Sequence, residues 1–167
     1  MSLFEPRWPI LFGLPGVVIR GVMANLRRIY HELVRFETEL WAAVDLRLRS
    51  DCGLPLTWFE VLFLLRREPG QRVYDVATAF AISVGGASKV VDKIEAAGLC
   101  RRVANPEDRR SNLLELTPSG AACVDEALLI FDDEIQLRVG GVMTEPELEQ
   151  FERSLLRLRG GNPAAPA

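Results

Sequence analysis

Residues able to perform acid–base, nucleophilic or metal chemistry are few and widely spaced in this sequence. There is one histidine, His31, and there are three cysteines, Cys52, Cys100 and Cys123. A structural zinc site needs four ligands in closely spaced pairs, and no two of these cysteines form such a pair. A Ser-His-Asp arrangement would depend on His31 alone. The sequence therefore predicts no enzyme, no metal site and no cofactor, and the cysteine spacing indicates a reducing compartment.

Basic side chains are the second group that could carry a function. Lys89 and Lys93 lie one helical turn apart, and two arginine pairs follow, Arg101–Arg102 and Arg109–Arg110. Lysine and arginine bind phosphates and base edges in nucleic acids. The chain has 20 Lys+Arg against 23 Asp+Glu and a net charge of −3, so a nucleic-acid surface would have to be local. The acidic residues concentrate near the C-terminus, at Asp125, Glu126, Asp132, Asp133, Glu134, Glu145, Glu147, Glu149 and Glu152.

The length and the pattern of apolar residues define what must hold these side chains in place. The chain has 167 residues, 49% hydrophobic and 26% charged, which is typical of one globular domain or a compact pair of subdomains. Apolar residues three and four apart predict one long helix over 20–49, too long for such a domain to bury alone. This stripe consists of Val22, Leu26, Ile29, Leu33, Phe36, Leu40, Val44 and Leu48.

Residues 57–120 predict shorter elements. A capping box at Thr57 and Glu60 opens a buried helix that ends at about Arg67. A helix over 73–80, followed by one capped by Ser83 and running to 97, makes a helix-turn-helix. The remaining segments predict strands over 101–104 and 113–116, a polar loop over 105–112, a helix from Thr117 to about 139, and a last helix over 144–159.

The N-terminal residues are apolar but fit neither a signal peptide nor a membrane span. Glu5 and Arg7 precede the apolar run 8–19, so its leading stretch has no net positive charge, and proline and glycine interrupt it. The run is also too short to cross a bilayer as a helix. We expect an apolar arm over 1–20 that packs on the protein itself or on a partner subunit, and no membrane association.

Four segments of the predicted helix-turn-helix and hairpin carry a family resemblance. They are 81–83, 90–99, 105–111 and 114–120, with the sequences AIS, VVDKIEAAGL, NPEDRRS and LELTPSG. Together they resemble the MarR family of winged helix-turn-helix regulators, whose wing carries D-x-R and then L-T-x-x-G. The resemblance implies a mainly α fold with a small β-wing, in which the winged helix-turn-helix is flanked by N- and C-terminal dimerisation helices.

The expected organisation has five parts. They are an arm (1–20), an N-terminal dimerisation helix (21–53), a DNA-binding lobe (54–120), C-terminal dimerisation helices (121–159) and a disordered tail (160–167).

The resemblance assigns the exposed face of the second helix and the wing to double-stranded DNA. Ser88 and Lys89 can donate to base edges or phosphates, and a wing arginine suits a narrow minor groove. In the family the wing aspartate, here Asp108, helps to hold that arginine. The expected DNA-binding residues are Ser83, Val84, Gly85, Ser88, Lys89, Lys93, Arg102, Arg109 and Arg110.

One feature departs from the family pattern. Gly85 and Gly86 occupy the first turn of the predicted recognition helix, where polar or basic side chains are expected. Each glycine costs about 0.5–1 kcal/mol of helix stability relative to alanine and removes a side chain that could read a base. Either the backbone approaches DNA very closely here, or base readout is poor.

The sequence thus predicts a cytoplasmic transcriptional repressor that binds a pseudo-palindromic operator as a homodimer. By family analogy, a small aromatic or anionic ligand would release it. The candidate pocket residues are His31, Arg35, Trp58, Phe59 and Phe63. Two alternatives remain: a protein-interaction module that has lost DNA binding, and a redox-responsive regulator working through Cys52 or Cys100. The basic residues could also be a solvated helix face with intrahelical ion pairs and a solubilising loop.

Overall fold

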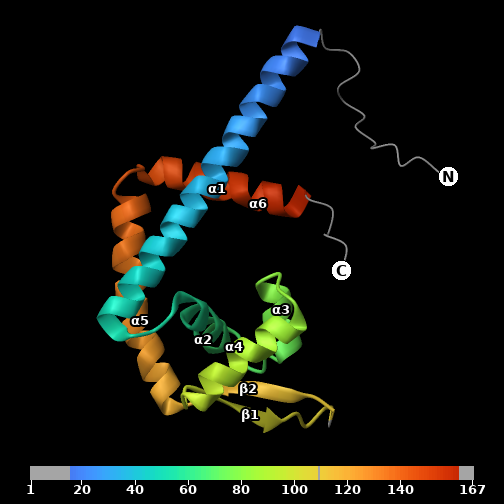
Figure 1. Ribbon diagram of the computed structural model, residues 1–167, viewed down its shortest axis with the longest axis vertical. Helices are drawn as coiled ribbons and strands as arrows, with labels where there is room; N and C mark the ends of the chain where they lie inside the picture. The colour runs from blue at the N-terminus through green and yellow to red at the C-terminus, as the bar shows by residue number, and fades with distance from the viewer. Residues whose placement is uncertain (1–15, 109, 162–167) are drawn as a thin grey trace, which may run out of the picture. The chain divides into compact units, whose positions relative to one another are not determined.

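A computed structural model describes residues 16–108 and 110–161, which form helices and a two-stranded hairpin (Figure 1). The chain divides into two compact units, Met1–Leu40 and Trp41–Ala167. Within the described part of the chain, no helix is both long and apolar enough to cross a lipid bilayer. The mainly α fold with a small β-wing is confirmed. The elements are α1 (Gly16–Cys52), α2 (Leu56–Arg67), α3 (Val73–Ala79), α4 (Val84–Ala96), β1 (Cys100–Ala104), β2 (Asn112–Leu116), α5 (Pro118–Ile135), the π-helical turn η1 (Gln136–Gly140) and α6 (Glu145–Gly161).

Helix α1 is longer than the sequence predicted. It begins at Gly16 rather than near Arg20, because the apolar residues assigned to the arm continue the helix. Its apolar stripe is buried only toward the C-terminal end, where Val44 and Leu48 are 2% and 0% exposed. Leu40 is half-buried, and nine large apolar side chains among the described residues of α1 are exposed, namely Met23, Leu26, Ile29, Tyr30, Leu33, Val34, Phe36, Trp41 and Leu46. The rest of the expected arm, 1–15, lies outside the described residues. Of the expected disordered tail, 160–167, the first two residues are helical and end α6, which corrects the predicted boundary, and 162–167 lie outside the described residues.

The predicted capping box at the start of α2 is wrong. The helix begins at Leu56, with Pro55 as its N-cap and no side-chain cap from Thr57. The carboxylate of Asp45 in α1 replaces that cap, accepting the backbone N–H of Leu56 at 2.8 Å. Hydrogen bonds from Arg49 and from this backbone N–H lower the pKa of Asp45, although partial burial opposes them. A contact distant in sequence thus satisfies the helix start, which local spacing could not reveal.

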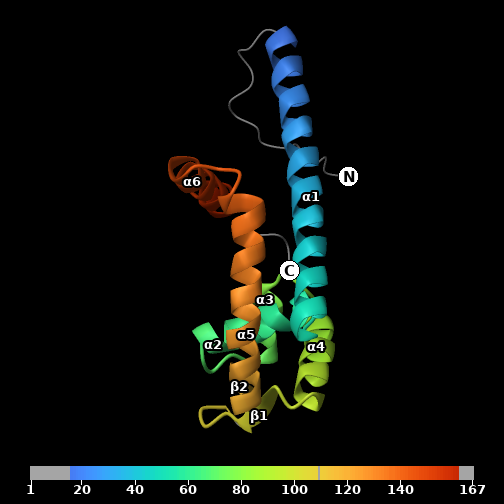
Figure 2. The same ribbon diagram turned by 90° about the vertical axis from the view of Figure 1, so that its left-hand side faces the viewer.

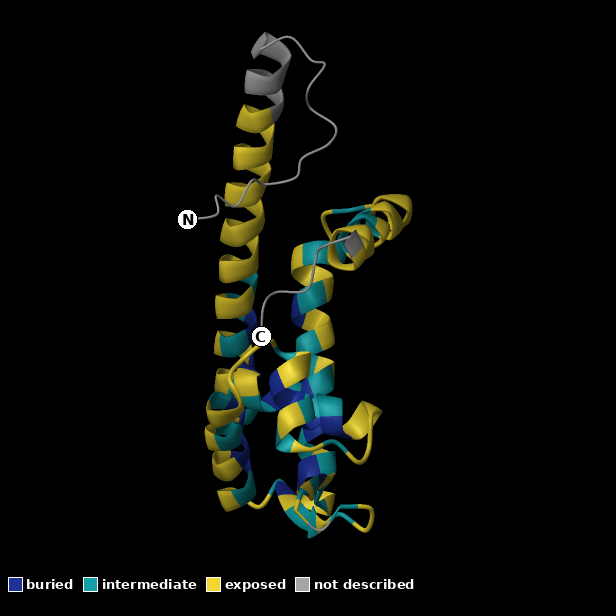
Figure 3. Ribbon diagram, turned by 90° about the vertical axis from the view of Figure 1, so that its right-hand side faces the viewer, coloured by how far each residue is buried: buried dark blue, intermediate teal, exposed yellow. Residues whose placement is uncertain are grey.

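The hydrophobic core lies among α2, α3, α4, β2 and α5. Figure 3 shows the buried positions on these elements. Phe59 is 1% exposed, and its ring stacks on Phe63 and Phe131 with centroids 5.6 and 5.0 Å away. The other fully buried side chains include Leu62, Val76, Val91, Ile94, Leu114 and Val124. The aromatic residues of α2 therefore contribute to the core that supports α4.

The hairpin and α5 are joined through Thr117 and Gly120. Strands β1 and β2 pair antiparallel, with Cys100 opposite Leu116 and Ala104 opposite Asn112. Both views place this hairpin at the end of the lobe where α5 begins (Figures 1 and 2). The Thr117 hydroxyl accepts the N–H of Gly120 at 3.0 Å and donates to the carbonyl of Gly98 at 2.7 Å. Thr117 is thus the predicted N-cap of α5 and also ties that helix to the end of α4.

Helix α5 ends earlier than predicted. The α-helical pattern stops at Ile135 instead of Val139, and a π-helical turn follows. The N–H of Gly141 donates to the carbonyl of Gln136, five residues earlier, at 2.7 Å. A Cβ at Gly140 would lie 2.5 Å from the Gln136 Oε1, the end of a flexible side chain that would have to move aside. The predicted helix break at Gly140–Gly141 is therefore preceded by a change of helix type.

We predict that Gly120→Ala destabilises the lobe strongly. A Cβ at this position would lie 1.8 Å from the backbone oxygen of Leu99, and backbone cannot move aside cheaply. We expect a loss of about 3 kcal/mol in the free energy of unfolding, measured by urea denaturation. The neighbouring exposed Ser119→Ala should change it by less than about 0.5 kcal/mol. Equal stabilities of the two variants would contradict this packing.

Candidate nucleic-acid interface

Helix α4 presents a polar and partly apolar face to solvent. Its N-cap is confirmed, because the Ser83 Oγ accepts the N–H of Gly86 at 3.1 Å. Ala87, Val91 and Ile94 are buried, which fixes the opposite face outward, although Val90, expected inward, is half-buried. Ser83, Val84, Gly85, Lys89 and Lys93 are exposed, and Ser88 is half-buried. Five of the expected DNA-binding residues of this helix and its cap are therefore available to a partner, and Ser88 is available in part.

A tight turn sets the start of α4. Ala81 has a φ of 51°, an uncommon value for a residue with a side chain. The N–H of Ile82 returns to the carbonyl of Ala77 at 3.0 Å, which joins this turn to α3. Ile82, 44% exposed, lies directly before Ser83, and sequence reasoning did not select it. An apolar residue directly before an N-cap often packs against the residue at the fourth helical position. Here that residue is Ala87, whose side chain is too small to cover Ile82, and this was the available signal.

The wing loop holds Asp108 in place and leaves Arg110 exposed. Asp108 accepts the backbone N–H of Arg110 at 3.0 Å, and the Arg110 Nε lies 3.5 Å from the same carboxylate oxygen. The Arg110 side chain is nevertheless 94% exposed. The backbone hydrogen bond from Arg110 lowers the pKa of Asp108, so the carboxylate stays ionised. Arg109 lies outside the described residues.

Arg102 lies in a different environment from the other expected DNA-binding cations. Its side chain is 23% exposed and forms ion pairs with Glu95 and with Asp92, the latter at 2.6 Å. Its backbone N–H also donates to Glu95 at 2.8 Å. Arg102 therefore connects β1 to α4, and sequence reasoning missed Glu95 and Asp92 as its partners. A charge spacing of seven and ten residues between a helix and a strand gives no periodic signal.

This ion-pair network frees the two lysines of α4. Neither Lys89 nor Lys93 pairs with any described carboxylate, because Asp92 and Glu95 turn toward Arg102. The predicted alternative of intrahelical ion pairs for these lysines is therefore wrong, whereas their exposure agrees with both a solvated face and a DNA-binding face. At the preceding position of β1, Arg101 pairs with Glu115 of β2 across the hairpin at 2.9 Å.

The expected ligand-pocket residues fall in two compact units. His31 and Arg35 belong to Met1–Leu40, where both are exposed and Arg35 donates to Glu39 at 2.8 Å. Trp58, Phe59 and Phe63 belong to Trp41–Ala167. Phe59 is core, whereas Trp58 and Phe63 are half-buried.

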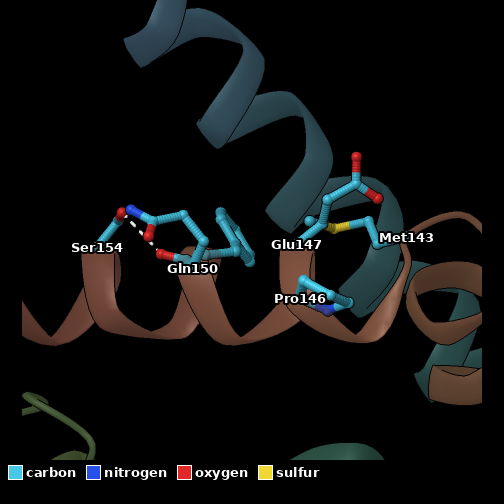
Figure 4. Close-up of a pocket in the computed structure, with 6 residues that line it drawn as sticks. Met143, Pro146, Glu147, Gln150 and Ser154 are labelled. Atoms are coloured by element: carbon cyan, nitrogen blue, oxygen red, sulfur yellow. Dashed lines mark hydrogen bonds between the residues drawn. The ribbon is translucent and has the colours of Figure 1, made fainter.

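A separate shallow groove of about 410 Å³ lies along α6 (Figure 4). Its lining is mostly apolar and includes Met143, Pro146 and Phe151, with Glu147, Gln150 and Ser154. It contains none of the expected pocket residues.

The cysteines differ in their chemistry. Cys100 is 2% exposed, and burial raises the pKa of its thiol to about 11, with Glu95 adding to the shift. Burial also raises the pKa of the Cys123 thiol. The thiolate is the reactive form, so Cys100 is a small core residue rather than a sensor. The Cys52 thiol is half-buried and donates to the carbonyl of Leu48 at 3.2 Å.

Known proteins share this arrangement. The sequence model of the MarR family matches residues 53–111, which run from the residue after α1 to the wing loop. The HTH-type transcriptional regulator MhqR of Bacillus subtilis is 30% identical over 106 residues, which cover 64% of this chain and 72% of MhqR.

Solved structures agree in fold. Sco3205 from Streptomyces coelicolor, a MarR family transcriptional regulator crystallised in complex with DNA, aligns with a TM-score of 0.78 and 22% identity over 96% of this chain and 94% of its own. Bordetella bronchiseptica BpsR, whose DNA binding is regulated by 6-hydroxynicotinic acid, aligns with a TM-score of 0.70 and 27% identity over 79% of this chain and 98% of its own. With its helix-turn-helix, wing and flanking helices in the same order, this chain belongs to the MarR family of winged-helix transcriptional regulators.

Proposed function

We propose that this regulator is a repressor that binds a pseudo-palindromic DNA operator as a homodimer and is released by a small molecule. The observation that carries DNA binding is the segregation of charge. Lys89, Lys93 and Arg110 are exposed, and the two lysines pair with no described carboxylate. The acidic residues concentrate on α5 and α6 instead. Cations on α4 and the wing fit a helix in the major groove and a loop at the minor groove.

The DNA complex of Sco3205 supports this proposal, because that protein shares the fold over 96% of this chain. We assign Ser83, Val84, Gly85, Ser88, Lys89 and Lys93 to the major groove. Arg110 is assigned to the phosphates or the minor groove beside the wing, with Asp108 holding its backbone. Arg109 joins it on the sequence argument alone.

We assign Arg102 a positioning role. Its charge is already matched by two carboxylates of α4, so little of it is available to phosphates. Its ion pairs fix the position of the first wing strand, β1, relative to the recognition helix, α4. That relative position determines whether α4 and Arg110 reach adjacent grooves together.

A second copy of the chain is the proposed cover for the apolar face of α1. Leu26, Ile29 and Leu33 are 52%, 53% and 42% exposed, which a monomer would leave in water. The C-terminal elements add exposed Leu137, Leu156 and Leu158. A dimer would place two α4 helices about 34 Å apart, one turn of DNA.

The effector is proposed to be a small aromatic acid. The regulation of BpsR by 6-hydroxynicotinic acid supports this class of ligand. The proposed aromatic contacts are the half-buried Trp58 and Phe63 of Trp41–Ala167. Arg35 and His31 are the candidates that the sequence offers for binding the carboxylate. Arg35 is preferred because a guanidinium remains charged and can bind a carboxylate through two hydrogen bonds.

The dimer should be obligate. An interface formed by these helices should bury more than about 2,000 Å² in total, as permanent dimers do. Sedimentation velocity at micromolar concentration should therefore show one species of twice the chain mass. A folded monomer under these conditions would exclude the obligate dimer.

Arg110→Ala should weaken DNA binding without unfolding the protein. The side chain is exposed, so the free energy of unfolding should change by less than about 0.5 kcal/mol. Each lost phosphate contact reduces the slope of log K against log salt by about 0.9, hence by about 1.8 for two wings. Gel shifts on the gene's own upstream DNA at several salt concentrations measure the DNA affinity and its salt slope. An unchanged affinity and slope would favour the protein-interaction module.

Arg102→Met separates positioning from contact in the same assay. Loss of the ion pairs to Asp92 and Glu95 should destabilise the lobe by about 1–3 kcal/mol and lower DNA affinity. Arg101→Met is the matched control, because its exposed pair with Glu115 should contribute little. The salt slope is measured in Arg102→Met combined with Asp92→Asn and Glu95→Gln, so that no freed carboxylate can pair with Lys89 or Lys93. An unchanged slope is expected, and a reduced slope would instead show a direct phosphate contact.

A salicylate-like aromatic acid should bind the dimer and weaken DNA binding. A ligand shifts the operator-competent state only through its different affinities for the two conformations. A tenfold loss of DNA affinity therefore needs about 1.4 kcal/mol of coupling, and DNA must weaken ligand binding by the same factor. Calorimetry with a panel of aromatic acids measures the ligand affinity of the free dimer and of the DNA-bound dimer, and the ratio of the two affinities gives the coupling. Equal ligand affinities in the two titrations would refute this coupling.

A further inference from the structure

Gly85 has no structural reason to be glycine within this chain. Its backbone φ lies outside the left-handed region, and a Cβ built on it meets nothing within 4 Å. A glycine in a helix nevertheless costs up to about 1 kcal/mol relative to alanine. Alanine at position 85 would therefore stabilise α4 at no steric cost to the free protein.

Other glycines of the lobe are explained by the fold. Gly98 has a φ of +74°, and Gly120 lies against the Leu99 carbonyl. Gly86 lies near the cap of its own helix, since a Cβ there would come 3.2 Å from the Ser83 Oγ. Gly85 is the exception, and its missing side chain points outward from an exposed position. We therefore expect that a bound partner, and not a contact within the chain, excludes a side chain at position 85.

Two exposed apolar side chains lie close to Gly85 in the sequence. Ile82 and Val84 are 44% and 48% exposed, and Lys89 of the same helix is exposed as well. A helix that exposes apolar side chains at its start and, one turn further on, a lysine that pairs with no described carboxylate suits a partner that is anionic overall but locally apolar. The major groove offers this combination, because phosphates flank base edges and the C5-methyl group of thymine is apolar.

We propose that Gly85 and Val84 determine operator specificity. The absence of a side chain at Gly85 lets the backbone of α4 approach the base edges closely, and Val84 packs against a thymine C5-methyl group. Each half-site then carries a thymine facing the first turn of α4. Readout in this turn is by shape and apolar contact rather than by hydrogen-bonding side chains. This inference rests on the proposed DNA-binding function and specifies how that function selects its site.

The first test compares Gly85→Ala with the wild-type protein. The wild type is used to select sites from a pool of random 30-base-pair duplexes, and both proteins are titrated with the enriched duplex. The midpoint of thermal unfolding should rise by about 2–4 °C, because the helix gains alanine. DNA affinity should fall by about tenfold per half-site, the effect of one mismatched base pair, hence by about 100-fold for the dimer. Gly160→Ala in α6, where a Cβ also meets nothing, is the control and should leave affinity unchanged.

The second test replaces each thymine of the enriched duplex in turn by deoxyuridine, which lacks only the methyl group. One thymine in each half-site should respond. Replacing it in a single half-site should weaken wild-type binding about fourfold, the effect of one buried methyl group. The same substitution should have no effect on Val84→Ala, which is already weaker on the thymine duplex. This pairing of a base methyl with one side chain distinguishes contact from a general loss of affinity.

The outcomes separate the inference from the function on which it rests. Enrichment and salt-dependent binding by the wild type, with full affinity in Gly85→Ala or equal deoxyuridine effects in wild type and Val84→Ala, would overturn the inference and leave the DNA-binding function intact. If the wild type enriches no sequence, the proposed function fails, and the inference fails with it. A more stable Gly85→Ala protein that binds DNA more weakly, with a methyl effect dependent on Val84, establishes it.

Discussion

The hydroxyl of Thr117 is the contact on which the arrangement of the lobe depends. It accepts the N–H that starts α5 and donates to the carbonyl of Gly98 at the end of α4. The backbone N–H of Thr117 also donates to Leu99, next to the start of β1, at 3.1 Å. One residue therefore fixes the recognition helix, both wing strands and α5. Gly120 completes this junction, because only a residue without a side chain lets α5 pack onto the Leu99 carbonyl.

Charge is divided between internal and external use in the same lobe. Asp92 and Glu95 neutralise Arg102 and hold β1 against α4, and Glu115 pairs with Arg101 across the hairpin. Lys89 and Lys93, which pair with no described carboxylate, and the exposed Arg110 then face solvent. An acidic chain can thus present a cationic surface without a basic overall composition. The net charge of −3 comes from the acidic residues of the C-terminal helices and not from α4 and the wing.

The sequence predicted the features that depend on local chemistry. Ser83 and Thr117 as N-caps, Gly98 as a helix stop and the hairpin strands to within one residue all follow from neighbouring residues. Features that depend on contacts distant in sequence could not be predicted. Asp45 caps α2 from eleven residues away, and the carboxylates of α4 capture Arg102 of β1. Of the predicted wing residues, Arg110 is exposed and Asp108 accepts its backbone N–H, but the internal role of Arg102 required the structure.

Internal ties of this strength limit how a small molecule could act on DNA binding. The wing, α4 and the start of α5 are joined by backbone hydrogen bonds, by the Thr117 hydroxyl and by partly buried ion pairs. Reshaping one lobe would break several of these contacts together, whereas changing the spacing of two intact lobes breaks none. A coupling of about 1.4 kcal/mol suffices for a tenfold effect and is smaller than the cost of disrupting such a network. Regulation in a dimer of this protein is therefore expected to move the two lobes relative to each other and to leave the groove-reading surface of each unchanged.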